Sequence, residues 1–371
     1  MMALQAGLRP SSRIAPCAAP ATGYAPPVPG RETLHMIRFG VFDHMDAPAS
    51  LDGFYADRLR LIEAYDAAGF YGYHVAEHHA TPLGLSPSPS VWLAAAAQRS
   101  TRLRLGPLVY TLPLYHPVRL IEEICMLDHL SNGRLMLGIG RGISPIELGY
   151  WGLDAAAAPA MYREALEVIL RGLAGGPLNY DGEYYKFHDM PMELAPVQRP
   201  HPPLWYGIGA PDGIPWAAAH AVNVVSNLPP GPMRAITERY RAEWAALGHS
   251  PESLPLIGLV RHMVVADTDA AARDIAEPAY RRWRESFLKL WIKHGQLPSP
   301  HALFPPSFAE AEAQGRAIAG NPERVRATVA AWAAESGIGY LLCRFAFGQM
   351  PPAAQLRSVA LFAGEVMPAF A

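Results

Sequence analysis

Short apolar runs alternate with helical segments from Ile37 to the end of the chain. Most runs lack strict alternation of apolar and polar residues, and near-continuous apolar runs are typical of parallel strands that are covered on both faces. Eight of them predict β-strands, at residues 37–42, 71–76, 103–110, 135–140, 203–209, 222–226, 258–266 and 339–345.

The segments between these runs carry the start and stop signals of helices. One helix is predicted to begin at Pro117 and to end at Asn132-Gly133. Another is predicted to begin after Asn321, a good N-cap residue, and to end at Gly337. Proline in the first turn and glycine just beyond the last turn favour these boundaries.

Eight strands that alternate with helices predict an α/β fold, a (β/α)8 TIM barrel with insertions, over residues 36–371. The main competing fold is a doubly wound open sheet, which the strand count disfavours. One insertion, at 140–203, has a predicted helix at 159–173 and a hairpin turn at Asp181-Gly182. A second lies at 267–338, and we expect 140–203 and 290–310 to be candidate lids.

Composition narrows the class of protein. Half of the 371 residues are apolar, 17% are charged and the net charge is −2. A large core is therefore expected, whereas nucleic acid and anionic membranes are not expected as partners. The three cysteines, Cys17, Cys125 and Cys343, are scattered, which favours a reducing cytoplasm over a disulfide framework.

The first 35 residues differ from the rest of the chain, because they are rich in Pro, Ala and Ser and have no apolar period. We predict a disordered N-terminal extension at 1–35. Met36 directly precedes the first predicted strand, so one hypothesis is that Met36 is the native start.

An acid and two imidazoles, Glu77, His78 and His79, follow the second predicted strand. Because side chains alternate along a strand, Glu77 and His79 are expected to point one way and His78 the other. No metal site is predicted from this set. A histidine beside a carboxylate suits proton transfer near neutral pH, and the alternative is a hydrogen-bonded surface pair.

Two glycine-rich turns follow the fourth and fifth predicted strands. The first, "LGIGRG" at 137–142, offers Arg141 as a fork for a phosphate, and the second is "WYGIGAPDG" at 205–213. Either turn alone is also an ordinary connection. Together they favour a phosphate clamped from two sides, with backbone N–H groups donating from the second. Tyr110, Tyr115 and His116, beyond the third strand, either line an apolar pocket or pack its rim.

From Met36 onward the chain resembles the bacterial luciferase-like family of flavin-dependent oxidoreductases. The resemblance rests on "GFYGYHVAEHH" at 69–79, on the continuous run 105–142 and on "PVQRPHPPLWYG" at 196–207, in the order that the family has them. It implies a (β/α)8 barrel that binds reduced FMN (FMNH2) or, in some branches, F420.

The resemblance also implies roles for individual residues. His78 matches the catalytic histidine, with Glu77 and His79 beside it, and Arg141 matches the phosphate ligand. The segment Leu108, Val109 and Tyr110 matches the stretch that backs the isoalloxazine, which commonly has a non-prolyl cis peptide. The remaining candidate cofactor-binding residues are Gly140, Gly142, Gly207, Gly209, Ala210 and Gly213.

The chain departs from the luciferases at two places. Gly140 stands where they have a reactive cysteine, so no thiol chemistry is expected there. Gly209, Ala210 and Gly213 stand where hydroxylated and acidic residues hold the phosphate, so backbone N–H groups would have to bind it here.

The resemblance predicts an FMN-dependent monooxygenase that oxidises an apolar small molecule, such as an aldehyde or ketone, with O2 through a C4a-peroxyflavin. We expect a separate flavin reductase to supply the reduced flavin, and we expect a homodimer. The alternatives are an F420-dependent dehydrogenase or reductase and a non-catalytic flavin-binding protein.

Overall fold

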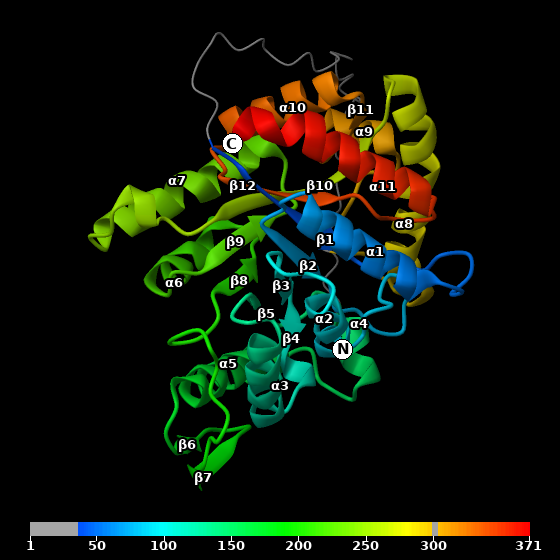
Figure 1. Cartoon of the computed structure of the whole chain (residues 1–371). Coiled ribbons are helices and arrows are strands. Elements are labelled where there is room, and N and C mark those ends of the chain that lie inside the picture. The colour runs from blue at the N-terminus through cyan, green and yellow to red at the C-terminus, as the bar shows by residue number, and fades with distance from the viewer. Residues whose placement is uncertain (1–35, 299–302) are drawn as a thin grey trace, which may run out of the picture.

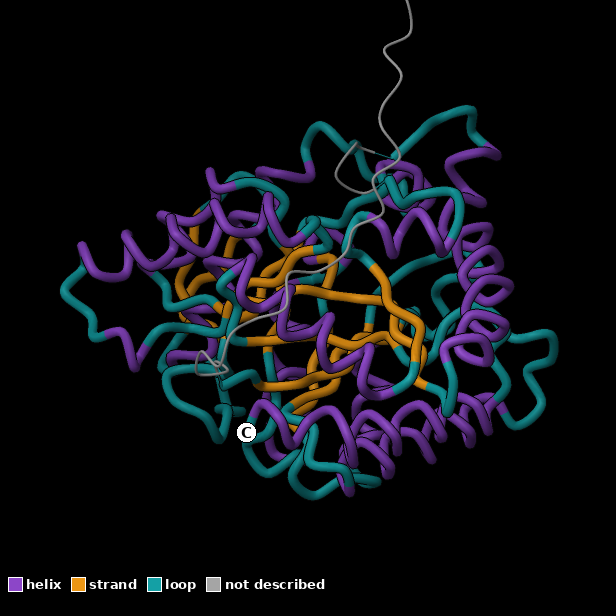
Figure 2. The backbone as a smooth tube through the Cα atoms, turned by 90° about the horizontal axis from the view of Figure 1, so that it is seen from above, coloured by secondary structure: helices purple, strands orange, loops and turns teal. Residues whose placement is uncertain are grey.

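A computed structural model describes residues 36–298 and 303–371 (Figure 1). The predicted N-terminal extension, 1–35, lies outside the described residues. The central feature is a ring of parallel strands surrounded by helices, which is clearest from above (Figure 2). The strands of the ring are β1 (Arg38–Asp43), β2 (Gly72–Val75), β3 (Arg104–Pro107), β4 (Tyr110–Thr111), β5 (Leu137–Gly140), β8 (Leu204–Gly207), β9 (Asn223–Ser226), β10 (Ile257–Val265) and β12 (Tyr340–Arg344).

The ring closes because β3 and β4 act as the two halves of one strand. The strand order is β3-β2-β1-β12-β10-β9-β8-β5-β4, with β3 paired to β2 and β4 paired to β5. A bridge between Leu105 and Leu135 joins β3 to the segment before β5. Counting β3 and β4 together gives the eight predicted strands. The (β/α)8 barrel is thus confirmed, and the open doubly wound sheet is wrong.

Helices cover the outside of the barrel (Figure 2). The predicted boundaries hold for α3 (Pro117–Leu130) and for α10 (Pro322–Ser336), where the Asn321 side chain accepts a bond from the N–H of Arg324 and Gly337 is left-handed. The other helices are α1 (Phe54–Ala67), α2 (Pro89–Ala97), α4 (Pro145–Tyr150), α5 (Ala158–Ala174), α6 (Ile214–Ala219), α7 (Pro230–Ala246), α8 (Asp269–Lys293), α9 (Phe308–Ala313) and α11 (Pro352–Leu361). Among the described residues no helix combines the length and the apolar character that crossing a membrane requires.

The two insertions differ in form. The first contains α4, α5 and the predicted hairpin, formed by β6 (Leu178–Asp181) and β7 (Lys186–Met190). The second contains α8, α9 and β11 (Ala317–Gly320), which pairs with the last four residues of β10. Strand β11 was not predicted, because its sequence, AIAG, has little of the β-branched or aromatic character of a strand.

Side chains fill the interior of the barrel, so it is not an open channel. Fully buried His74, Trp205 and Tyr340 pack against one another there, and Nε2 of His74 lies 3.2 Å from the Tyr340 hydroxyl. Gly40 makes room for this packing, because a Cβ at Gly40 would lie 1.9 Å from the Tyr340 hydroxyl oxygen. A ligand therefore cannot pass through the barrel interior at this level.

Candidate active site

The predicted site residues gather at the carboxyl end of the barrel. His78 follows β2, Arg141 follows β5, and the loop 207–213 follows β8. Strands β5 and β8 are neighbours in the sheet, so Arg141 and the loop 207–213 lie side by side on the rim. Catalytic groups occupy this end in barrels of this kind.

The Glu-His-His stretch separates into two directions, as expected. Nε2 of His79 lies 3.0 Å from Oε1 of Glu77. The buried Glu77 carboxylate also accepts bonds from the N–H of Thr111, at 2.7 Å, and from the hydroxyl of Tyr115, at 3.0 Å. Glu77 thus ties the end of β2 to the end of β4, and neither Glu77 nor His79 forms a hydrogen bond with the His78 ring.

His78 instead pairs with Glu147, the third residue of α4. Nδ1 of His78 lies 3.2 Å from Oε1 of Glu147, and Oε2 of Glu147 accepts a bond of 2.7 Å from the backbone N–H of His79. Helix α4 is held in this place by Ser144, whose hydroxyl accepts from the N–H of Glu147 at 3.2 Å. Both side chains of the pair are mostly buried, at 14% and 12% exposed.

Each member of the pair shifts the pKa of the other so that the charged forms, a protonated His78 and an ionised Glu147, are favoured. Burial lowers the pKa of His78, but the charge of Glu147, the hydrogen bond to it and the charge of Glu77 outweigh burial and hold the pKa above its usual value. Burial raises the pKa of Glu147, but the contacts with His78 and His79 outweigh burial and hold that pKa below its usual value. His78 therefore stays protonated to a higher pH than an ordinary histidine.

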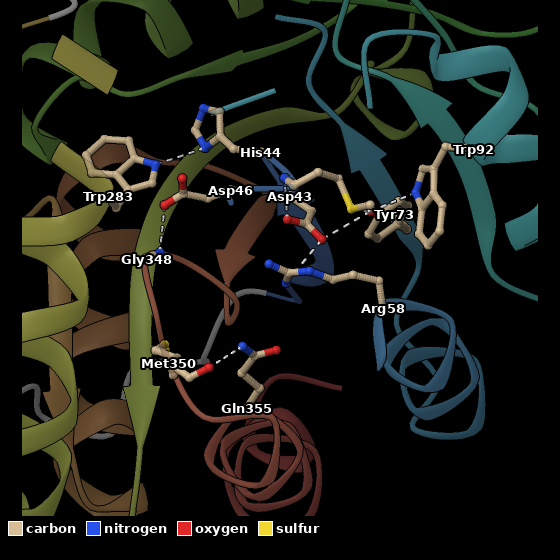
Figure 3. Close-up of polar contacts among 11 residues, drawn as sticks. Asp43, His44, Asp46, Arg58, Tyr73, Trp92, Trp283, Gly348, Met350 and Gln355 are labelled. Carbon is tan, nitrogen blue, oxygen red and sulfur yellow. Dashed lines mark hydrogen bonds and ion pairs between the residues drawn. The ribbon is translucent and has the colours of Figure 1, made fainter. Parts of the chain in front are cut away.

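A second histidine, His44, lies against His78. It follows β1, its ring stacks on that of His78 with 5.9 Å between centroids, and its Nδ1 accepts a bond of 3.3 Å from the indole of Trp283 (Figure 3). Burial, followed by the nearby charges of Arg344, His78 and His262, holds the pKa of His44 well below its usual value. A neutral imidazole thus faces the protonatable one.

Buried polar contacts fix the segment that carries His44 (Figure 3). On one side of it, Asp43 lies 3.5 Å from Nη1 of Arg58 and accepts a bond from the Tyr73 hydroxyl. On the other, Oδ2 of Asp46 accepts a bond of 2.9 Å from the N–H of Gly348. Burial raises the pKa of Asp46 to about 6. These contacts join the β1 end to α1, to β2 and to the segment that follows β12.

The glycines of "LGIGRG" bring β5 close to the neighbouring strand. A Cβ at Gly138 would lie 2.0 Å from the carbonyl oxygen of Pro107, and a Cβ at Gly140 would lie 2.3 Å from Cγ2 of Val109. Gly142 is left-handed, and a Cβ there would lie 2.8 Å from Cγ2 of Thr111. Contact with protein, rather than room for a ligand, therefore accounts for these glycines.

The predicted non-prolyl cis peptide is present between Leu108 and Val109, at the junction of β3 and β4. Leu108 packs at the edge of the barrel interior. The side chain of Tyr110 is fully buried and its hydroxyl lies 2.8 Å from that of Ser90 on α2. Only the backbone of Tyr110 is thus free to face the mouth of the barrel.

The rim beside the cis peptide exposes hydrogen-bond donors that have no partner among the described residues. Arg141 is exposed, and its guanidinium forms no ion pair or hydrogen bond within 36–298 and 303–371. Gly207, Gly209, Ala210 and Gly213 are also exposed, and a Cβ at Gly207 would meet no atom within 4 Å. An unpaired guanidinium next to bare backbone is the donor set that a phosphate requires.

Sequence reasoning missed Glu147, His44 and Arg344. Glu147 had a local signal, since Ser144 and Glu147 have the spacing of a capping box, but the box does not reveal that the carboxylate turns to His78. His44 directly follows β1 and Arg344 ends β12, so both stand at the carboxyl ends of strands, as His78 does. Among the described residues no group of three His, Cys, Asp or Glu side chains is arranged to hold a metal ion.

Comparison with known proteins places this site in context. The family model described as luciferase-like monooxygenase matches residues 35–339. Protein y4wF of Sinorhizobium fredii is 43% identical, over 89% of this chain and 96% of its own. The oxygenase component of the flavin-dependent trigonelline monooxygenase of Acinetobacter baylyi is 29% identical over 64% of this chain and 67% of its own. The crystal structure of monooxygenase RslO1 from Streptomyces bottropensis is 26% identical and superimposes with a TM-score of 0.81, covering 90% of this chain and 100% of that one.

Proposed function

Since the chain belongs to the family of luciferase-like monooxygenases, a family of flavin-dependent enzymes, we propose that it is the oxygenase component of a two-component monooxygenase. A separate reductase would supply reduced FMN, and the substrate would be a small molecule with an apolar body. The observation that carries the proposal is the His78–Glu147 pair, which lies on the same rim as the unpaired Arg141.

The rim fits the flavin. Arg141 and the N–H groups of the loop 207–213 would hold the phosphate, and the backbone at Leu108-Val109 would support the ring system. The pairing of β5 with β8 supports this assignment, because it brings the two proposed phosphate-binding elements to the same part of the rim. When bound, the reduced flavin would supply the electrons with which O2 is activated.

His78 is the group proposed to move a proton. Its Nδ1 is engaged by Glu147, whereas its Nε2 forms no hydrogen bond within the described residues. Glu147 fixes the orientation of the ring and favours its protonated form. His78 can therefore hold a proton at Nε2 near neutral pH and give it to an oxygen atom in the mouth of the barrel.

Apolar side chains from α8 cover one side of this histidine. A cavity of about 10 Å³ is lined by His78 and Glu147 together with Phe287, Leu290 and Trp291. Excluding water matters because oxygen activated in an open site is lost as hydrogen peroxide.

The test compares two adjacent imidazoles. His78→Ala should bind reduced FMN as the wild type does but release hydrogen peroxide in place of oxygenated product. His79→Ala is the matched control, because His79 contacts Glu77 and Trp151 and should retain most coupling. Product yield and peroxide are measured together, with the aldehydes and ketones of increasing size as trial substrates. Equal coupling in the two variants, or binding of F420 with exclusion of FMN, would contradict the proposal.

A further inference from the structure

A buried arginine at the barrel mouth lacks an acidic partner. Arg344 ends β12, is 2% exposed, and donates through Nη2 to Oδ1 of Asn227 at 2.9 Å. Its Nε and Nη1 have no hydrogen-bond partner, and no carboxylate lies within 4.0 Å of it among the described residues. Burying a cation without a paired anion is costly, so its place here calls for an explanation.

The strand next to it presents a second unpartnered group. His262 of β10 is in register with Arg344, is fully buried, and neither of its ring nitrogens has a hydrogen-bond partner. Burial first, and then the charges of Arg344 and Arg261, hold the pKa of His262 well below its usual value. One fixed positive charge and one neutral donor therefore stand side by side, which suits a single negative charge.

Aromatic rings surround the guanidinium. Its Cζ lies 4.9 Å from the ring centroid of Phe42 and 5.7 Å from that of Trp283. These contacts partly compensate for burial but leave the in-plane N–H groups unused. Polar donors within apolar walls are typical of a site for a small organic molecule.

A series of side-chain contacts connects the arginine to His78. Trp283 is 4.2 Å from the His262 ring, centroid to centroid, and donates to His44, whose ring stacks on His78. Asn227, which accepts the hydrogen bond from Arg344, is half-buried and therefore more exposed than Arg344 or His262. A molecule anchored at Arg344 would thus extend across Trp283 and His44 towards His78.

We propose that Arg344 and His262 bind a carboxylate group of the substrate, so that the substrate class is a carboxylic acid with an aromatic or otherwise apolar body. This inference rests on the proposed function, because it places the far end of that acid near His78. The carboxylate is bound and not transformed.

The experiment uses the full-length protein without flavin, and benzoate as the probe. Benzamide is its neutral counterpart of the same shape. Benzoate should bind at pH 7.5, quench the tryptophan fluorescence and raise the Tm, whereas benzamide should bind at least 10-fold more weakly. Arg344→Met keeps the apolar stem and should lower benzoate affinity 10- to 100-fold, as the loss of charge-assisted hydrogen bonds implies. Arg344→Lys should retain part of the affinity.

Two further measurements separate the possible outcomes. Arg344→Met should bind FMN as the wild type does and should unfold in a single cooperative transition, which shows that the variant is folded. Equal affinity for benzoate and benzamide, unchanged benzoate affinity in Arg344→Met, or no benzoate binding by the wild type would overturn the carboxylate site. Failure of the wild type to bind FMN would instead count against the proposed function.

Discussion

Nδ1 of His78 lies 3.2 Å from Oε1 of Glu147, although 69 positions separate the two residues in the chain. The contact joins the end of β2 to the short helix α4, so the orientation of the imidazole depends on an insertion outside the basic barrel. The proposed proton donor and its positioning residue therefore come from different parts of the fold.

Replacing Glu147 should change the ionisation of His78. In Glu147→Gln the pKa of His78 should fall, because the opposing charge that outweighs burial is lost. NMR titration of the histidine rings measures this directly. Glu122→Gln, which removes an exposed acid from α3, is the control and should leave the His78 titration unchanged. An unaltered His78 titration in Glu147→Gln would show that the pair does not form in solution.

The same pair predicts a window of stability. The raised pKa of His78 stabilises the fold below the usual histidine pKa, and this contribution is lost as pH rises through the folded value. The lowered pKa of Glu147 stabilises it above the usual glutamate pKa, and this contribution is lost as pH falls through the folded value. The difference in free energy of unfolding between wild type and Glu147→Gln should therefore be largest between these limits, as denaturant titration at several pH values can measure.

Arg141→Ala should weaken FMN binding by about 10- to 100-fold, the loss expected for charge-assisted hydrogen bonds to a phosphate. Riboflavin, which lacks the phosphate, should bind equally to Arg141→Ala and wild type. Arg171→Ala on α5 removes a charge of the same kind at a distance from the mouth and serves as the control. Equal FMN affinity in wild type and Arg141→Ala would place the phosphate elsewhere.

The contribution of Asp46 to the free energy of unfolding should depend on pH in the opposite direction to that of Glu147. Because burial raises its pKa to about 6, the folded state favours the protonated acid, and the contribution of Asp46 to stability should fall as pH rises from about 4 to about 6. Asp46→Asn, which keeps an oxygen for the N–H of Gly348, should remove that decline. The stability of Asp46→Asn minus that of the wild type should therefore increase by up to about 3 kcal/mol between pH 4 and pH 8. Parallel curves for the two proteins would refute the assignment.

Gly140→Ala should destabilise the fold by about 1–3 kcal/mol, because the added methyl group overlaps Val109. Val109→Ala removes the overlapping atom and should restore part of the loss in the double variant. Gly207→Ala is the matched control, since open space surrounds that position. Thermal unfolding of the wild type and these four variants tests this, and similar losses for Gly140→Ala and Gly207→Ala would show that strand contact is not the cause.

The eight barrel strands and the direction of His78 were accessible from sequence because both depend on local pattern: apolar runs, glycine and proline punctuation, and alternation along a strand. The partners of His78 were not accessible. Glu147 and His44 reach it only through the closure of the barrel and the path of an insertion, and a single sequence specifies neither. Arg344 ends an apolar strand, and the pattern of one sequence does not specify whether its side chain points into the barrel or towards the surface.

The packed side chains of His74, Trp205 and Tyr340 close the interior of the barrel. Both the flavin and the substrate would therefore have to approach His78 from the carboxyl end of the barrel. We expect them to arrive in a fixed sequence, the deeper one first, and to leave in the reverse sequence. The order of binding and release would then depend on residues of the barrel interior that contact no reactant.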